Sequence, residues 1–522
     1  MSAAPLAPEG GPGPGGDPVG ASDAAHVAAW GDAWSVPTDA PAGAAGEAAD
    51  GRGGVRPHWR GVLDALDRLG PAALAERARR LGRAAGSLCP SSPDADGPAW
   101  RLDPVPLPLP APEFAALEAG LIQRARLLEA LLADVYGPQT VLADGTLPPA
   151  LVFANPGFLR ACRTDPAPGG PPLQALAFDL VRGPDRIWRV LADLTDGAPG
   201  AGYAREGRRL LARVLPEPFR AARPRRLGPF FAAWREALRD AAPDPPTSPG
   251  PRATPGPDGP TGVALLVPGP GGPHRADDAL LSRALGCPPV HGRDLVVRGG
   301  GVSVRSAAGE RPVRVLLRRV EGARTDPLEL APDGAAGVAG LLGAARAGAV
   351  RVVNGPGAGV VEAPAFAAFW PALCRRLLGE SLRLPGPPTL WLADAVARER
   401  LGRQPARWRI RPALDPAAPA LPASGAGERA ALDAGLVARP WEFVAVGEVA
   451  PAVAPAWDPD AGGPAVRPIV LRAFAVRDGR GWTVMPGGMA RLVAPGVPAC
   501  RSLPGRVVAK DVWVLDPAAG AP

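Results

Sequence analysis

A proline-rich segment near the middle of the chain most constrains how it can fold. Residues 242–261 read APDPPTSPGPRATPGPDGPT and contain no large apolar side chain. Such composition is typical of a linker, because proline interrupts both helices and central strands. The segment therefore predicts a boundary between an N-terminal region, residues 51–241, and a second region that begins near residue 262.

The second region alternates apolar strands with amphipathic helices. We expect strands at 263–267, 313–317 and 350–353, and helices at 276–285, 335–347 and 364–379. This order is typical of α/β architecture, so residues 262–385 are predicted to form one α/β lobe. Residues 386–522 then mix short strands with loops.

The N-terminal region contains the clearest single element. Residues 113–136 place apolar side chains three and four apart, and Gly137 and Pro138 follow as a stop signal. A β-hairpin is expected at 173–195. Residues 1–50 are rich in Ala, Gly and Pro and contain few large apolar side chains, so we expect a disordered tail there.

Composition excludes several classes of protein. The chain has 522 residues, of which 46% are hydrophobic, and its net charge of +7 comes almost entirely from arginine, since Lys510 is the sole lysine. The arginines are spread evenly along the sequence and only 5% of residues are aromatic, so no nucleic-acid surface is expected. There is no long uncharged apolar stretch, no secretory signal and no CxxC among the five cysteines. We expect a cytoplasmic protein that binds no membrane.

Two aspartates in the hairpin form the first candidate site. If the turn is centred near residue 186, Asp179 lies directly opposite Asp193, and their side chains share one face of the sheet. Two like charges at that distance suggest a shared cation such as Mg²⁺, with Thr195 adding an oxygen ligand. Alternatively, both aspartates end their strands and face solvent.

Two glycine-rich turns form the second and third candidates. Asn354, Gly357 and Gly359 lie in a strand-to-helix turn whose backbone N–H groups could surround a phosphate. A tight turn without a ligand is the alternative, because the dinucleotide fingerprint lacks its last glycine. Arg472 and Arg491 flank the loop MPGG (485–488), where guanidinium groups suit phosphate binding and an ordinary surface role is equally compatible.

Nine segments taken together resemble the circularly permuted type 2 ATP-grasp family. They follow one another in order and cover most of residues 55–515. They are VRPHW (55–59), WRLDPVPL (100–107), QRARLLEALLADVYGPQ (123–139), LPPALVFANPGFLRAC (147–162), VLADLTDGAPGAGYAREGR (190–208), LLRRVEGARTDPLEL (316–330), VVNGPGAGVVEAPA (352–365), MPGGMAR (485–491) and KDVW (510–513).

The resemblance implies a circularly permuted ATP-grasp fold, with two α/β lobes around a nucleotide cleft and the nucleotide lobe at 386–522. It implies ATP and Mg²⁺ as cofactors and a ligase that phosphorylates a peptide or amino-acid carboxylate before an amine or thiol attacks. The expected metal ligands are Asp179, Asp193 and Thr195, and the catalytic arginines are Arg411, Arg472 and Arg491. The expected nucleotide contacts are Asn354, Gly357, Gly359, Arg411 and Arg472, and the expected substrate contacts are Tyr203, Glu206 and Arg208.

The chain departs from the family pattern at polar positions. Thr195 replaces an asparagine, Arg411 replaces a lysine, and the hinge segment reads Ala445-Val446-Gly447 in place of Ala-Gln-Glu. We therefore keep three hypotheses: an active ligase, a degenerate relative that binds a partner protein as a scaffold, and a basic surface for anionic polymers. The first requires the two aspartates to share one cation, so aspartates on opposite faces of the sheet would favour the second.

Overall fold

The structure is a computed structural model. It describes residues 45–49, 54–88, 100–163, 172–243, 262–269, 272, 274–307, 309–421, 426–458, 461–493 and 508–516. Most of the expected N-terminal tail and almost all of the expected linker at 242–261 lie outside this set. None of the helices in the described part of the chain combines the length and apolarity that a membrane span needs.

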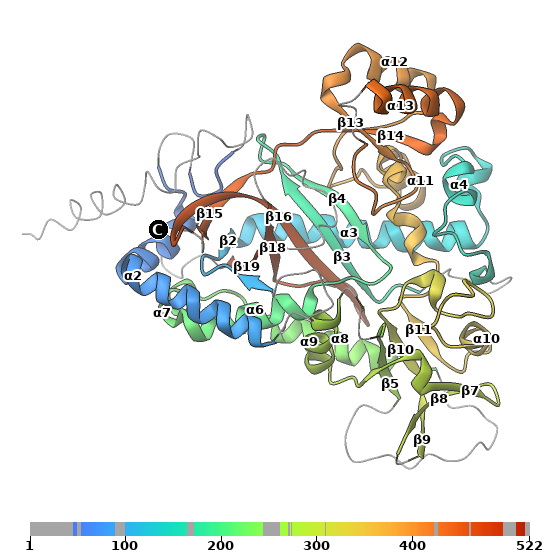
Figure 1. The fold of residues 1–522 in the computed structure, drawn as a ribbon, viewed down its shortest axis with the longest axis horizontal. Helices are drawn as coiled ribbons and strands as arrows, with labels where there is room; N and C mark the ends of the chain where they lie inside the picture. Colours follow the sequence, from blue (N-terminus) through green and yellow to red (C-terminus); the bar gives the residue numbers. More distant parts are fainter. Residues whose placement is uncertain are drawn as a thin grey trace, which may run out of the picture.

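A nine-stranded sheet forms the centre of the molecule (Figure 1). Its main order is β1-β19-β18-β16-β3-β4, with β2 on β19 and with β15 and β17 on β16. The bounds are β1 Arg101–Leu102, β2 Leu107–Pro110, β3 Ala175–Arg182, β4 Trp188–Leu194, β15 Val453–Asp458, β16 Gly463–Asp478, β17 Gly481–Val484, β18 Gly487–Leu492 and β19 Val508–Leu515. Strands from both ends of the chain thus complete one sheet.

Helices cover both faces of this sheet. The helix α3 packs on one face, where its Arg124 bonds Asp193 of β4, and α6 and α8 pack on the other, against β18 and β16. The α-helices of this half are α2 Pro57–Leu88, α3 Ala111–Tyr136, α4 Thr140–Ala143, α5 Ala150–Phe153, α6 Ala201–Val214, α7 Pro216–Ala222 and α8 Gly228–Asp240, and η1 Arg160–Cys162 is a 3₁₀ turn. Because its two faces are covered, the central sheet is largely buried.

The second lobe is built on a four-stranded parallel sheet with the order β11-β10-β5-β6. A separate hairpin sheet, β7-β8-β9, lies at the bottom of Figure 1. The bounds are β5 Val263–Leu266, α9 Arg275–Leu285, β6 Pro289–Val290, η2 Gly292–Asp294, β7 Leu295–Arg298, β8 Gly301–Ser306, β9 Gly309–Val313, β10 Val315–Arg318, η3 Gly322–Arg324, α10 Leu341–Arg346, β11 Arg351–Val353, η4 Ala358–Glu362, η5 Pro364–Ala368 and α11 Trp370–Leu378.

A small lobe follows α11 and lies at the top of Figure 1. Its three-stranded antiparallel sheet has the order β12-β14-β13. The bounds are β12 Thr389–Trp391, α12 Ala395–Arg403, η6 Pro405–Arg407, β13 Trp408–Pro412, α13 Ala426–Ala438, η7 Pro440–Glu442 and β14 Phe443–Gly447. After β14 the chain returns to the central sheet through β15, so the strands after residue 453 belong with the hairpin β3–β4 and not with this small lobe.

The predicted periodic elements are present with shifted ends. The expected helix 113–136 is α3, and the expected hairpin is β3–β4. The expected helix at 364–379 instead divides into the 3₁₀ turn η5 and the shorter α11. Pro364 and Pro371 each occupy the first turn of one of these pieces, where proline is tolerated because those N–H groups have no helical partner.

Candidate functional site

The register of the hairpin differs from the expected one by one residue. Asp193 of β4 lies opposite Phe178, and Asp179 of β3 lies opposite Ala192, because the pairing shifts at a bulge between Asp179 and Leu180. Neighbouring residues of a strand point to opposite faces, so a shift of one residue turns the two carboxylates away from each other. The prediction that Asp179 and Asp193 share one face is wrong.

Asp179 is fully buried in an ion pair with two arginines. Its two carboxylate oxygens accept hydrogen bonds from Nε and Nη2 of Arg472, at 2.7 and 2.8 Å, and Nη2 of Arg491 donates to one of them at 2.8 Å. Arg472 lies directly opposite Asp179 on β16, and Arg491 comes from β18. The sequence analysis selected all three residues, and the fold brings them together on one face of the sheet.

One carboxylate faces two guanidinium groups in this cluster. Burial opposes the charged form of Arg472, but the charge and hydrogen bonds of Asp179, together with other nearby acids, outweigh burial and raise the pKa of the guanidinium. Asp277 and Glu362 act on it in the same direction. Nη1 of Arg472 donates to the carbonyl of Pro199 at 3.1 Å, and only 8% of the residue is exposed. Both arginines are therefore engaged inside the protein.

Asp193 forms a separate ion pair on the opposite face. Nε and Nη2 of Arg124 donate to its two carboxylate oxygens, at 3.0 and 2.7 Å, and the Arg124 guanidinium lies 4.1 Å from the ring centre of Trp370. The expected third ligand, Thr195, donates its hydroxyl to the carbonyl of Ala358 at 2.8 Å. Asp193 and Thr195 thus serve as links between secondary-structure elements.

Asp179 and Asp193 cannot share one Mg²⁺ ion. They lie on opposite faces of the sheet, and the β4 residues on the face of Asp179 are Ala192 and Leu194, whose side chains carry no oxygen. Within the described residues, no group of three or more His, Cys, Asp or Glu side chains is arranged to hold a metal ion. The expected metal site at Asp179, Asp193 and Thr195 is therefore not formed.

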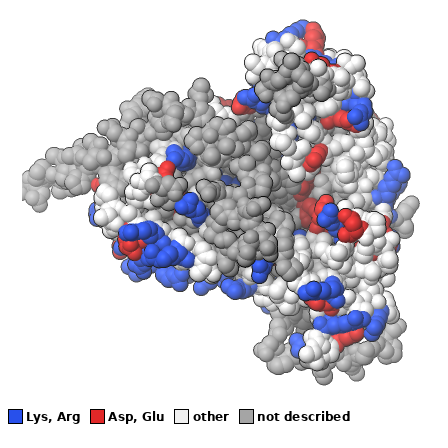
Figure 2. Space-filling model, viewed as in Figure 1, with Lys and Arg blue, Asp and Glu red and all other residues white. Residues whose placement is uncertain are grey.

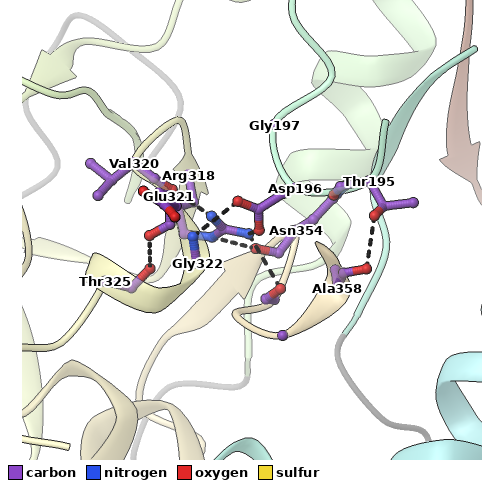
Figure 3. A network of polar contacts seen from close by, with 12 residues as sticks. Thr195, Asp196, Gly197, Arg318, Val320, Glu321, Gly322, Thr325, Asn354 and Ala358 are labelled. Carbon is purple, nitrogen blue, oxygen red and sulfur yellow. Dashed lines mark hydrogen bonds and ion pairs between the residues drawn. The ribbon is translucent and has the colours of Figure 1, made fainter. Parts of the chain in front are cut away.

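The amide of Asn354, which is labelled in Figure 3, makes all four of its hydrogen bonds within the protein. Its oxygen accepts from the backbone N–H groups of Gln174 and Ala175, and its nitrogen donates to the carbonyls of Ala175 and Thr195. Since an amide has two donors and two acceptor sites, none remains for a phosphate. Asn354 fastens the second lobe to the start of β3 and the end of β4.

The two glycines of the same turn are packed against side chains. Gly357 has φ 89°, and a Cβ there would lie 2.3 Å from the hydroxyl oxygen of Tyr136. A Cβ at Gly359 would lie 3.4 Å from the Cβ of Asp196, which is close to an ordinary contact. The turn continues as the 3₁₀ turn η4 and the N–H of Val360 bonds back to Gly357, so these atoms build a tight turn, as in the alternative interpretation.

Arg411 lies on β13 of the small lobe, on a different sheet from Arg472 and Arg491. Its Nη2 donates to the carbonyls of Pro416 and Ala418, at 3.1 and 2.9 Å, which fixes the loop that follows its own strand. The Arg411 guanidinium is therefore held by hydrogen bonds within the small lobe.

The three expected substrate residues on α6 have separate surroundings. The ring of Tyr203 lies 4.9 Å from that of Trp100, and Glu206 pairs with Arg209 at 3.0 Å. Arg208 is buried and pairs with Asp511 of β19 at 2.7 Å. Tyr203 and Glu206, three residues apart, are neighbours on the helix surface, whereas Arg208 points into the protein towards β19.

Two further ion-pair groups escaped the sequence analysis. Arg319, directly after β10, pairs with Asp277 and Asp278 of α9, at 2.8 and 2.6 Å, and Asp277 also accepts the N–H of Gly200 at the start of α6. Arg318 pairs with Asp196 at 2.8 Å (Figure 3). The signal in the sequence was a pair of adjacent arginines at the end of an otherwise apolar strand.

A surface cavity of about 630 Å³ opens elsewhere, between α3 and the segment before β12. None of the expected site residues lines it. Its lining residues are Ala119, Ile122, Gln123, Arg126, Glu380, Ser381 and Arg383. The expected nucleotide contacts and this cavity are therefore different parts of the molecule.

The comparisons with known proteins establish the family. The model of the family described as "circularly permuted ATP-grasp type 2" matches residues 106–493, and this chain belongs to that family. The glutathione synthetase-like effector of Globodera pallida has the same general fold, with a TM-score of 0.53 over 85% of this chain and 98% of that one, at 11% identity. The predicted fold, a mixed α/β ATP-grasp architecture, is confirmed.

Three relatives show how far the similarity extends. An uncharacterised protein of Mycobacterium tuberculosis is 36% identical over 490 residues, which is 91% of this chain and 54% of that protein. A second uncharacterised protein of that bacterium is 33% identical over 90% of this chain and 84% of its own length. A Frankia alni protein whose name proposes a glutamate–cysteine ligase is 37% identical over 67% of this chain and 39% of that protein. The chain spans about half the length of the first of these relatives.

Proposed function

We propose that this chain is a degenerate ATP-grasp protein that acts as a binding or scaffold protein without ligase turnover. The observation that carries the proposal is the environment of Asp179: Arg472 and Arg491 bind its carboxylate, and Ala192, not Asp193, lies opposite it. Several residues to which the resemblance assigns magnesium or phosphate form internal ion pairs here.

The remaining site residues support the same conclusion. Asn354 is saturated by backbone groups, Arg411 is bonded to carbonyl oxygens of its own loop, and Arg208 is paired with Asp511. A ligase needs cationic groups that are held ready for the phosphate of the substrate, because catalysis of phosphoryl transfer consists mainly of positioning and charge stabilisation. Guanidinium groups already bound to buried carboxylates must first break those pairs, which costs free energy.

The second candidate is an ATP-dependent carboxylate–amine or carboxylate–thiol ligase that acts through an acyl phosphate on a peptide or amino acid. Its family and the name of the Frankia alni relative favour it. In that case Arg472 and Arg491, which share one face of the sheet, would bind the phosphates of ATP. The metal of such a reaction would need ligands other than the pair Asp179 and Asp193.

Nucleotide turnover separates the two candidates. The full chain is titrated calorimetrically with ATP and Mg²⁺, and ADP release is then measured in pools of amino acids and short peptides with amines or thiols added. We expect no ADP release that depends on a carboxylate. Carboxylate-dependent ADP release that falls in Arg472→Met, with the variant still folded by circular dichroism, would establish the ligase and overturn the scaffold proposal.

A further inference from the structure

Exposed arginines gather on three neighbouring helices, at the lower left of Figure 2. The helices α2, α6 and α7 pack against one another there, and Arg77 ties them together by donating to the carbonyl of Val214 and to Glu217. We name this surface the arginine face. Its basic residues are Arg77, Arg79, Arg80, Arg83, Arg209, Arg213, Arg220 and Arg223.

The local sequence explains why these arginines share a surface. On α2, Arg79, Arg80 and Arg83 are spaced by one, three and four residues and remain exposed, while Leu74 and Leu81 turn inward. Arg209 and Arg213 are four apart on α6, so they lie one above the other. Helical spacing thus converts arginines that are scattered in the sequence into one surface.

The arginine face carries most of the net charge of the chain. Its eight arginines are accompanied by three glutamates, Glu76, Glu206 and Glu217, in a chain whose total net charge is +7. Arg79 and Arg83 pair with Glu76, at 2.8 and 3.4 Å. For Arg80, Arg213 and Arg223, the described part of the chain offers no carboxylate within ion-pair distance.

The chemistry of this surface fits an acidic protein better than a nucleic acid. Single-stranded nucleic acid is bound by aromatic side chains on which bases stack, and the large exposed apolar residues of the described chain all lie elsewhere. They are Phe153, Ile187, Leu328, Val396 and Val437. Rows of guanidinium groups at helical spacing complement rows of carboxylates, which arginine can bind with two parallel hydrogen bonds.

We propose that the arginine face is a docking surface for an acidic segment of a partner protein. The inference rests on the proposed scaffold function and names the chemistry of the partner. Arg80, Arg213 and Arg223 supply the uncompensated charge, and the paired arginines around them supply further donors at the rim. Opposite charges of this kind mainly raise the rate of association and set the partner, and salt weakens them.

Binding of a fluorescently labelled oligoglutamate peptide to the full chain tests this. The test variant combines Arg80→Glu, Arg213→Glu and Arg223→Glu. The control combines Arg311→Glu, Arg375→Glu and Arg400→Glu, which changes the net charge equally at exposed positions of the other lobes. We expect anisotropy to report binding at low salt, and an affinity about ten-fold or more weaker in the test variant alone. Thermal melting confirms that both variants fold.

Each other outcome has a distinct meaning. No peptide binding at low salt, or an equal loss in the control variant, overturns the inference while the scaffold proposal stands. Tighter binding of single-stranded RNA or duplex DNA in competition would assign the face to nucleic acid and also overturn it. Carboxylate-dependent ADP release would instead remove the scaffold function, whatever the peptide does.

Discussion

Phe178 of β3 lies directly opposite Asp193 of β4, and this pairing separates the two acids of the hairpin. Asp193 faces α3 and bonds Arg124, whereas Asp179 faces the other way and bonds Arg472 and Arg491. Each acid neutralises arginine on its own side of the central sheet. Asp193 thus fastens α3 to the sheet, and Asp179 ties β3 to β16 and β18 within the sheet.

Removing either charge should destabilise the fold strongly. In Asp179→Asn, two buried guanidinium groups lose their counter-ion, and in Asp193→Asn the same happens to Arg124. Breaking one partner of a buried pair costs about 3–5 kcal/mol, because the other charge stays buried without compensation. Urea denaturation of both variants measures the free energy of unfolding.

The control for this comparison is Asp185→Asn. Asp185 pairs with Arg189 in the exposed hairpin turn, and a surface pair contributes at most about 1 kcal/mol. If Asp179→Asn were no more destabilising than Asp185→Asn, Asp179 would not be the counter-ion of the two arginines.

Magnesium should leave the stability of the protein unchanged. A ligand that binds only the folded state raises the melting temperature, and the rise grows with the logarithm of the ligand concentration above its Kd. The described residues contain no group of three or more His, Cys, Asp or Glu side chains arranged to hold a metal ion. We therefore expect the same melting temperature with excess MgCl₂ and with EDTA, measured at equal ionic strength. An increase that continues with rising MgCl₂ concentration and is absent with NaCl of equal ionic strength would reveal a metal site outside the residues considered above.

Gly357→Ala should destabilise the turn that carries Asn354. The substitution combines a positive φ with a collision between the new Cβ and the hydroxyl of Tyr136. Gly348→Ala is the matched control, since Gly348 has φ 72° but nothing within 4 Å of its Cβ position. We expect a loss of about 1 kcal/mol for the control and about 2–4 kcal/mol for Gly357→Ala. Equal losses in urea denaturation would mean that Tyr136 moves aside without cost.

The sequence predicts where helices and strands lie much better than it predicts which way their side chains point. The spacing of Phe114, Leu117 and Leu121 is enough for α3, and the apolar runs around Gly183 are enough for the hairpin. The bulge next to Asp179 leaves no mark in the sequence, because an extra residue in a strand needs no special side chain in this conformation. One unseen residue therefore reversed the interpretation of the site.

The pairing of strands that are far apart in the chain could not be predicted from the sequence either. That β16 would lie beside β3, almost 300 residues earlier, follows from the fold of the whole chain and not from any local pattern. The same holds for charge: the arginines are evenly spread along the sequence, and packing of α2, α6 and α7 gathers eight of them. The order of the nine matched segments was sufficient for the family, since a family is defined by what its members share.

Acid should weaken the fold through His58, at the start of α2. Burial, reinforced by the positive charges of Arg56 and Arg186, lowers the pKa of His58 from 6.5 to about 4. The folded state therefore disfavours the charged imidazole, so this contribution to stability is complete above pH 6.5. It is lost as the pH falls from 6.5 towards 4, by on the order of 2–3 kcal/mol.

The control variant is His58→Gln, whose side chain stays neutral at every pH. The difference in the free energy of unfolding between wild type and His58→Gln, from urea denaturation at a series of pH values, isolates this residue from the carboxylates that titrate in both proteins. A difference independent of pH between 6.5 and 4 would contradict the burial of the neutral ring, because a solvated histidine titrates alike in the folded and unfolded chains.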